Sequence, residues 1–453
     1  MSTILDTSTK PELTPEALDQ FQAAFTGDSA NLQAMNAVAQ SPLTKVAVNH
    51  EVAARIDHSF SDHLEENAIT HQKQSGRCWL FAALNTFRVT AIKEMNLSDS
   101  FELSQSYLCF YDKLEKSNYF LENILATLDE PVGSRLLDHL LSDPIQDGGQ
   151  WHMFVNLIKK YGVVPQSAMP ETDSSSATRP MNGQVTGRLR EFAFKLRTAS
   201  ENGATQQELR DTKMRQMAQV YKMLCVHLGV PPTSFEWQWR DKDKAFKRAG
   251  EITPQKFYDD YIKADLDDLV CLINDPRPGH DFKRLYTVKF LGNVVGGDPI
   301  AYVNIDLETM KRATIEQIKD GEPVWFGCDV GKYLHRDLGV MDTDLYSFDL
   351  VYGEDIDLGK AERLQYGHSM MNHAMVFTGV DLDDAGSPRK WRVENSWSDK
   401  PGDKGYFQMS DPWFDEYSFE VVVSKKYLSP DVVAVLDQDP VELEPWDPMG
   451  SLA

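Results

Sequence analysis

The sequence predicts an α+β protein in which helices come first and antiparallel strands come last. Apolar residues recur at helical spacing early in the chain, at Leu80, Leu84, Phe87 and Ala91. Late in the chain, 391–395 alternates apolar and polar residues, as a half-buried strand does. Because helices and strands are segregated along the chain, an α+β order is favoured over a regular βαβ alternation.

The helical elements are expected in the following order. A Thr-Pro-Glu triplet, with proline at the first helical position, begins a helix within 12–25. The range 72–116 is typical of a loop followed by two helices with a short polar break between them. A turn-rich stretch at 143–149 then leads into another helix at 151–160.

Strands are expected after residue 297. The ranges 298–306 and 322–330 are the first of them, and 374–380 is a short apolar run. Further strands are expected at 405–409 and 420–423. With the strand at 391–395, these late segments predict a mainly antiparallel sheet.

The chain is expected to divide into four parts: a helical half over 1–170, a helical insertion over 171–300, a β-rich half over 301–427 and a C-terminal arm over 428–453. A polar stretch at 171–176 marks the start of the insertion. The arm has six acidic residues and no basic ones, yet its last eight residues include Trp, Met and Leu. Apolar residues this close together are rare in disordered tails, so we expect the arm to be ordered.

The chain as a whole is strongly acidic. Its 453 residues include 46 Lys and Arg against 69 Asp and Glu, a formal net charge of −23, and 42% are hydrophobic. The apolar content is typical of a folded globular protein, and the charge disfavours general binding to nucleic acid or anionic membranes. The range 181–250 is locally basic, with 13 Lys and Arg against 7 Asp and Glu, so it carries +6 and the rest of the chain −29.

Cysteine usage points to a reducing compartment. The five cysteines include no closely spaced pair, which excludes a disulfide framework and a zinc ribbon. The N-terminus lacks the basic and apolar regions of a secretory signal, and no run approaches the ~18 apolar residues of a membrane span. We expect a cytoplasmic protein without membrane attachment, and neither a metal nor a cofactor.

Cys78, within 72–82, is the sharpest candidate for chemistry. Its thiol begins an amphipathic helix, where the helix dipole favours the thiolate and is expected to lower the thiol pKa. Ser75 and Gly76 supply a cap and a tight turn that expose the sulfur. Gln72 lies six residues before the cysteine, where its amide can help to stabilise an oxyanion.

A cysteine nucleophile needs a general base, and the base needs an orienting partner. His373 stands just before an apolar strand, and Asn395 ends the next strand, 22 residues later. A β-hairpin would bring the two side by side, so that Asn395 holds one imidazole nitrogen and the other faces the thiol. Trp397 would shield this hydrogen bond from water. The chain order Cys, His, Asn is that of the papain-type thiol proteases.

The sequence resembles the bleomycin hydrolase and aminopeptidase C family of papain-like cysteine peptidases. The resemblance covers nearly the whole chain from residue 72 onward, and its motifs occur in family order. They are QKQSGRCWLFA at 72–82, DGGQW at 147–151, YGVVP at 161–165, NHAM at 372–375, WRVENSW at 391–397 and WDPMG at 446–450. The fold implied is papain-like, with a helical half, a β-rich half, an insertion and a C-terminal arm.

The resemblance implies a catalytic set. Cys78 is the nucleophile, His373 the general acid and base, and Asn395 its orienter. Gln72 and the backbone N–H of Cys78 form the oxyanion hole. The implied reaction is release of N-terminal residues from peptides through a thioester, with bleomycin-hydrolase-like amide hydrolysis possible.

The resemblance also implies how substrates and subunits bind. Gly148 and Gly149 would line the substrate groove beside Trp397, because a bare backbone can pair with an extended peptide. In this family the C-terminal arm lies in the active-site cleft, which would place the carboxylate of Ala453 opposite the α-ammonium of the substrate. The family assembles as a homohexamer, and 171–300 would supply contacts between subunits.

Two positions depart from the pattern, and two other functions stay open. Ser75 stands where secreted papain-like enzymes have a disulfide cysteine, and Ser398 stands where glycine is common. The alternative functions are a papain-like endopeptidase with an open cleft and a nucleic-acid-binding regulatory protein that uses the basic insertion. The acidic net charge makes nucleic acid an unlikely partner.

Overall fold

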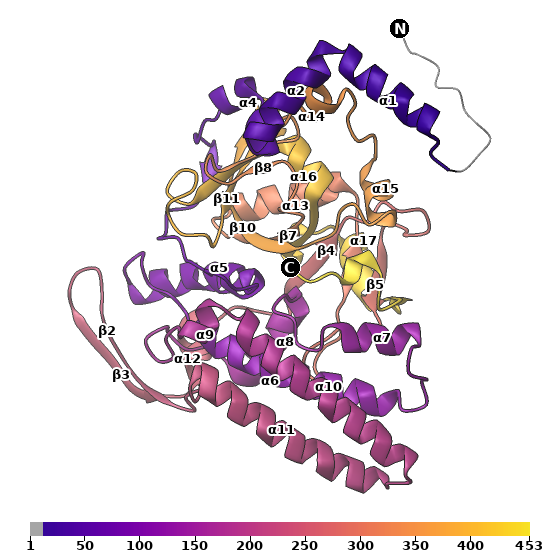
Figure 1. Cartoon of the computed structure of the whole chain (residues 1–453). Coiled ribbons are helices and arrows are strands. Elements are labelled where there is room, and N and C mark those ends of the chain that lie inside the picture. The colour runs from indigo at the N-terminus through magenta and orange to yellow at the C-terminus, as the bar shows by residue number, and fades with distance from the viewer. Residues whose placement is uncertain (1–11) are drawn as a thin grey trace.

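Helices gather in one half of the molecule and strands in the other (Figure 1). The structure, a computed structural model, describes residues 12–453. The helices of the first half are α5 (Cys78–Met95), α6 (Gln105–Ala126), α7 (Arg135–Ser142), α8 (Trp151–Tyr161), α9 (Asp173–Ser176), α10 (Arg179–Glu201) and α11 (Gln206–Leu228). The segregation of helices from strands confirms the predicted α+β class.

The second half is built on one sheet with mainly antiparallel pairing, in the order β14-β5-β6-β4-β13-β7-β10-β11-β12-β9-β8, with β1 beside β10. The long central strands are β7 (Val324–Cys328), β10 (His373–Leu382), β11 (Pro388–Glu394), β12 (Tyr406–Ser410) and β13 (Ser418–Ser424). The others are β1 (Asp62–His63), β4 (Leu269–Ile273), β5 (Arg284–Val288), β6 (Tyr302–Asn304), β8 (Leu334–His335), β9 (Val340–Met341) and β14 (Val441–Leu443). The late antiparallel strands lie where the sequence predicts them.

Each face of the sheet has its own core, because successive side chains of a strand point to opposite faces. On β7, Trp325 enters the core shared with α5 and α8, where its ring lies 5.8 Å from that of Trp151. The next residue, Phe326, enters the core on the other face and stacks on Phe377 at 3.8 Å. Helices α13 (Leu307–Lys319) and α16 (Asp411–Tyr417) contribute to that second core. Strand β7 is therefore buried between the two cores.

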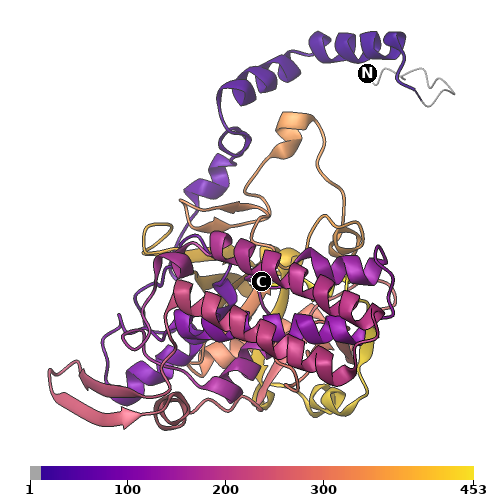
Figure 2. The ribbon, with the colours of Figure 1, turned by 60° about the horizontal axis from the view of Figure 1, so that its bottom comes forward.

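The range 171–300, predicted as a helical insertion, also contains strands. Its long helices end at Leu228, and a hairpin of β2 (Phe235–Arg240) and β3 (Phe246–Ile252) then projects from the body (Figures 1 and 2). Strands β4 and β5 of the same range belong to the main sheet, because the apolar run of β4 is buried between β6 and β13. The hairpin carries the exposed basic residues Arg240, Lys242, Lys244, Lys247 and Arg248.

The described part of the chain begins with helices that stand away from the body (Figure 2). They are α1 (Pro15–Gly27) and α2 (Ser29–Gln40), and the short helices α3 (Leu43–Val46) and α4 (His50–Ala54) lead back to the sheet. Neither α1 nor α2 buries a residue, although Leu18, Phe21 and Phe25 are apolar. Within 12–453, every helix is too short or too polar to cross a membrane.

The C-terminal arm is ordered, as its composition predicts. It passes through the short helix α17 (Pro430–Val433) and the 3₁₀ turn η3 (Ala434–Asp437), adds β14 to the sheet edge beside β5, and forms a second 3₁₀ turn, η4 (Pro448–Gly450). Its last residue lies between the helical half and the sheet (Figure 1). The arm therefore ends at the junction where α5 meets β10. The remaining short elements are α12 (Pro254–Phe257), the π-helix η1 (Tyr258–Ile262), α14 (Phe348–Tyr352), α15 (Lys360–Gln365) and the 3₁₀ turn η2 (Lys425–Tyr427).

Candidate active site

Cys78 is the first residue of α5 and lies against strand β10. The helix begins here because Leu80 and Phe81 donate their backbone N–H groups to the carbonyl of Arg77. The Cys78 sulfur is hydrogen-bonded to the backbone N–H of Ala374, the residue after His373. Helix packing thus brings together two residues that are almost 300 positions apart in the sequence.

His373 and Asn395 form the hydrogen bond that the hairpin predicts. Strands β10 and β11 pair antiparallel, and His373 Nε2 lies 3.0 Å from Asn395 Oδ1. The backbone N–H of Ser396 also donates to this oxygen, at 2.8 Å, which fixes it as the acceptor. Nε2 must therefore carry the proton, and Nδ1 is left as the basic nitrogen of the neutral ring.

Trp397 covers this pair. Its ring centroid lies 5.0 Å from that of His373, and the guanidinium of Arg336 lies 5.0 Å above the indole. The neighbouring Ser398 has φ +72°, in the left-handed region that favours glycine. Glycine adopts this conformation without strain, which makes it the expected residue at this position. The Ser398 N–H donates a hydrogen bond to the carbonyl of Thr70.

Burial sets the protonation of the thiol and the imidazole. It raises the pKa of Cys78 to about 11, although hydrogen bonds from the backbone N–H groups of Ala374 and Trp79 act in the opposite direction. Burial also lowers the pKa of His373 to about 4, against the hydrogen bond to Asn395. Both shifts favour a neutral thiol and a neutral imidazole in this closed site. The lowered thiol pKa expected from the helix dipole is wrong for this closed site, because desolvation is the larger effect.

Gln72 is held in the turn before the cysteine by hydrogen bonds on both sides of its amide. Nε2 donates to the carbonyl of Ser75 at 2.6 Å, and Oε1 accepts from the hydroxyl of Ser396 at 2.6 Å. The second N–H of Nε2 remains available as a hydrogen-bond donor. The Ser75 hydroxyl donates to the carbonyl of Gln72, so the serine that replaces a disulfide cysteine closes this turn.

Gly148 and Gly149 pair with the end of the arm. The N–H of Gly149 donates to a carboxylate oxygen of Ala453 at 3.2 Å, and the N–H of Ala453 donates to the carbonyl of Gly149 at 3.3 Å. A Cβ on Gly148 would lie 2.6 Å from the Ala453 oxygen, and one on Gly149 would lie 2.5 Å from the Trp79 ring. Both glycines are thus required by close approach of other groups.

Asp147, the first residue of the DGGQW motif, holds this loop in place through several polar contacts. It accepts hydrogen bonds from the N–H of Gly76 and the side chain of Asn182, and it pairs with Lys113 Nζ at 2.8 Å. Burial raises its pKa, but the Lys113 ammonium and these hydrogen bonds outweigh burial and hold the pKa well below its usual range. The carboxylate therefore ties the glycine loop to the turn before Cys78. The only signal in the sequence is its place before two glycines.

The chain matches one family model and close relatives over almost all of its length. The model describes the Peptidase C1-like family and matches residues 12–450. An aminopeptidase C of Listeria monocytogenes is 45% identical over 98% of this chain and 99% of its own. The human bleomycin hydrolase is 44% identical over 93% of this chain and 94% of its own. A crystal structure of PepW from Lactobacillus rhamnosis is 46% identical, with a TM-score of 0.96 over 98% of this chain and all of that one.

Proposed function

The chain belongs to the Peptidase C1-like family, and we propose that it is a cysteine aminopeptidase that releases residues from the N-termini of peptides. One observation carries the proposal: Ala453 forms hydrogen bonds with the backbone N–H and C=O of Gly149, which lies against Trp79, the residue after Cys78. An extended substrate would need the same backbone groups. The names and full-length similarity of the relatives support the same activity.

The reaction follows from the neutral pair. As the sulfur of Cys78 attacks the scissile carbonyl, its proton moves to Nδ1 of His373, and Asn395 keeps the imidazolium in place through Nε2. The free N–H of Gln72 and the backbone N–H of Cys78 stabilise the oxyanion. His373 then protonates the leaving amine and later takes a proton from the water that hydrolyses the thioester.

The arm accounts for exopeptidase specificity. Because it fills the groove beyond the first substrate residue, only a peptide that begins near the nucleophile fits. The carboxylate of Ala453 then meets the α-ammonium of that residue in a charge-assisted hydrogen bond. An open-cleft endopeptidase would leave the backbone of Gly149 free, so the bonded arm favours the aminopeptidase.

Kinetics with free and N-acetylated aminoacyl-arylamides test this function. We expect a strong preference for the free amine, and we expect iodoacetamide to label Cys78 with loss of activity. Cys78→Ser is the matched control, and it should lose nearly all activity because the alcohol is a far weaker nucleophile. Full activity in Cys78→Ser, or equal rates on the two substrates, would contradict the proposal.

The protein is further proposed to be a cytoplasmic homo-oligomer, with six subunits by analogy to its family. All five cysteines are free thiols, which suits a reducing compartment. Apolar side chains stand exposed on α1 and on the helices of the insertion, among them Phe21, Phe25, Phe194, Met214 and Val226. Such surfaces commonly mark protein interfaces. Light scattering should give about 310 kDa against 51.4 kDa for one chain, and a monomer at micromolar concentration would refute the assembly.

A further inference from the structure

Two neighbouring residues anchor the arm to opposite halves of the molecule. On one side, the ring of Trp446 lies under the guanidinium of Arg135, at 3.9 Å from the ring centroid, and edge-on to His139 at 6.3 Å. Both partners belong to α7 in the helical half. On the other side, the carboxylate of Asp447 enters an ionic cluster beside the sheet. The arm therefore crosses the junction of the two halves at a single dipeptide.

The ionic cluster is built around Arg277, in the loop after β4. Its Nη2 lies 2.7 Å from Asp275 Oδ2 and 2.7 Å from Asp447 Oδ1, and its Nε donates to Asp275 Oδ1 at 2.9 Å. The side chains of Asp275 and Arg277 are 1% and 8% exposed. Removal of one partner from a hydrogen-bonded ion pair that is shielded in this way is costly, because it leaves a buried charge without compensation.

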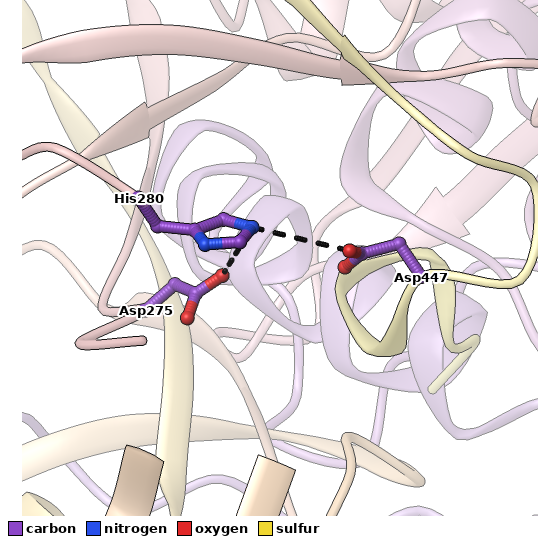
Figure 3. Close-up of side chains that lie close together, drawn as sticks. All are labelled: Asp275, His280 and Asp447. Carbon is purple, nitrogen blue, oxygen red and sulfur yellow. Dashed lines mark ion pairs between the residues drawn. The ribbon is translucent and has the colours of Figure 1, made fainter. Parts of the chain in front are cut away.

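His280 completes the cluster. Its Nε2 lies 3.7 Å from Asp275 and 3.9 Å from Asp447, between the two carboxylates (Figure 3). Two carboxylates and an imidazole can hold a metal ion, but here the Arg277 guanidinium already bonds to both carboxylates. The cluster is therefore a contact between loop and arm, and the cation that joins them is the arginine.

The path from this cluster to the active site is short and rigid. Asp447 accepts the N–H of Met449 and so caps the 3₁₀ turn η4, and the Met449 side chain is buried. Gln150, next to the glycine loop, then donates to the carbonyl of Ser451. Five residues lie between Asp447 and Ala453, and backbone hydrogen bonds from Gly450 to Asp447 and from Ser451 to Pro448 hold this short segment. A fixed Asp447 therefore fixes where the arm ends.

We infer that Arg277 and Arg135 are positioning residues for the aminopeptidase reaction: they hold Asp447 and Trp446, and through them the tip of the arm, in the cleft. This inference rests on the proposed function and adds residues that touch neither the substrate nor Cys78. Its consequence is that substrate end-specificity depends on a loop after β4 and on helix α7, both outside the catalytic set.

Kinetic end-specificity tests the inference in the full-length protein. The readout is the ratio of kcat/KM for a free aminoacyl-arylamide to kcat/KM for its N-acetylated form. Loss of a shielded charge pair typically costs more than a tenfold change in equilibrium, so Arg277→Met should lower this ratio at least about tenfold. Arg135 is exposed, and an exposed cation–π contact contributes less, so Arg135→Met should lower the ratio ~2- to 5-fold. Lys289→Met is the matched control, because Lys289 pairs with Glu444 of the arm at an exposed site, with side chains 38% and 53% exposed. Such pairs contribute little, and the ratio should stay unchanged.

Asp447→Ser covers the case in which Arg277→Met does not fold, since it leaves the Arg277–Asp275 pair intact and keeps a side chain that can cap η4. It should lower the ratio like Arg277→Met, with iodoacetamide labelling of Cys78 retained. An unchanged ratio in folded Asp447→Ser and Arg135→Met would overturn the inference. A wild-type protein that shows no preference for the free amine would instead overturn the proposed function.

Discussion

Deletion of Leu452 and Ala453 should turn the enzyme from an aminopeptidase toward an endopeptidase. The arm is extended at its tip, and an extended residue spans ~3.3 Å, so the end of the chain would retreat by ~7 Å. The two backbone hydrogen bonds between Ala453 and Gly149 would be lost, and so would the proposed carboxylate contact with the substrate ammonium. A hydrogen bond between charged groups contributes ~1.5–3 kcal/mol, which corresponds to a ~10- to 150-fold loss of kcat/KM on free aminoacyl-arylamides.

The assay compares free and N-acetylated substrates for the wild type, the deletion and Ala453→Gly. The glycine variant keeps the carboxylate and both backbone bonds, so it should behave like the wild type. In the deletion, N-acetylated peptides should become better substrates, because the backbone of Gly149 is free to pair with them. An unchanged preference for the free amine in the deletion would refute the reasoning, since the arm would then play no part in specificity.

Three further predictions concern the catalytic residues and the glycine loop. Burial raises the pKa of Cys78 to about 11, and only the thiolate is alkylated. The rate of iodoacetamide labelling should therefore rise about tenfold per pH unit from pH 7 to pH 10. A rate that does not change above pH 6 would indicate a preformed thiolate. Gln72→Ala should lower kcat by ~10²–10³ by removing one oxyanion donor, with unchanged labelling of Cys78. Gly149→Ala should lower the free energy of unfolding by ~1–3 kcal/mol in urea titrations, because its Cβ would meet the buried Trp79 ring at 2.5 Å. Gly183→Ala is the control: Gly183 lies in open space within α10, so this change should leave the stability unchanged or raise it.

The pairing of His373 with Asn395 was predictable because its geometry is local. A histidine and an asparagine at facing ends of two consecutive strands must meet if the strands form a hairpin, and β10 and β11 do so. The helix start at Cys78 is likewise a local pattern of a tight turn followed by apolar residues at helical spacing. Each of these features depends on fewer than about 30 residues of sequence.

The features that escaped prediction depend on distant segments. The pKa of the Cys78 thiol follows from its cover by β10 and the surrounding core, not from its own helix. The strand β4 is a five-residue apolar run, which periodicity alone does not separate from a buried helix. The pairing of Arg277 with Asp447 joins residues 170 positions apart, and nothing in either neighbourhood indicates the other.

The arm that pairs with Gly149 has a consequence for inhibition. Because it is covalently attached, it competes with any ligand for the groove at an effective concentration that is typically millimolar for a short tether. An extended peptidic inhibitor must displace it, and its apparent dissociation constant rises as the inverse of the fraction of molecules in which the arm has left the groove. Compact inhibitors that fill only the space between Cys78 and the arm avoid this competition. Selective inhibitors of this protein should therefore be short and carry a free amine, unlike inhibitors designed for open-cleft thiol proteases.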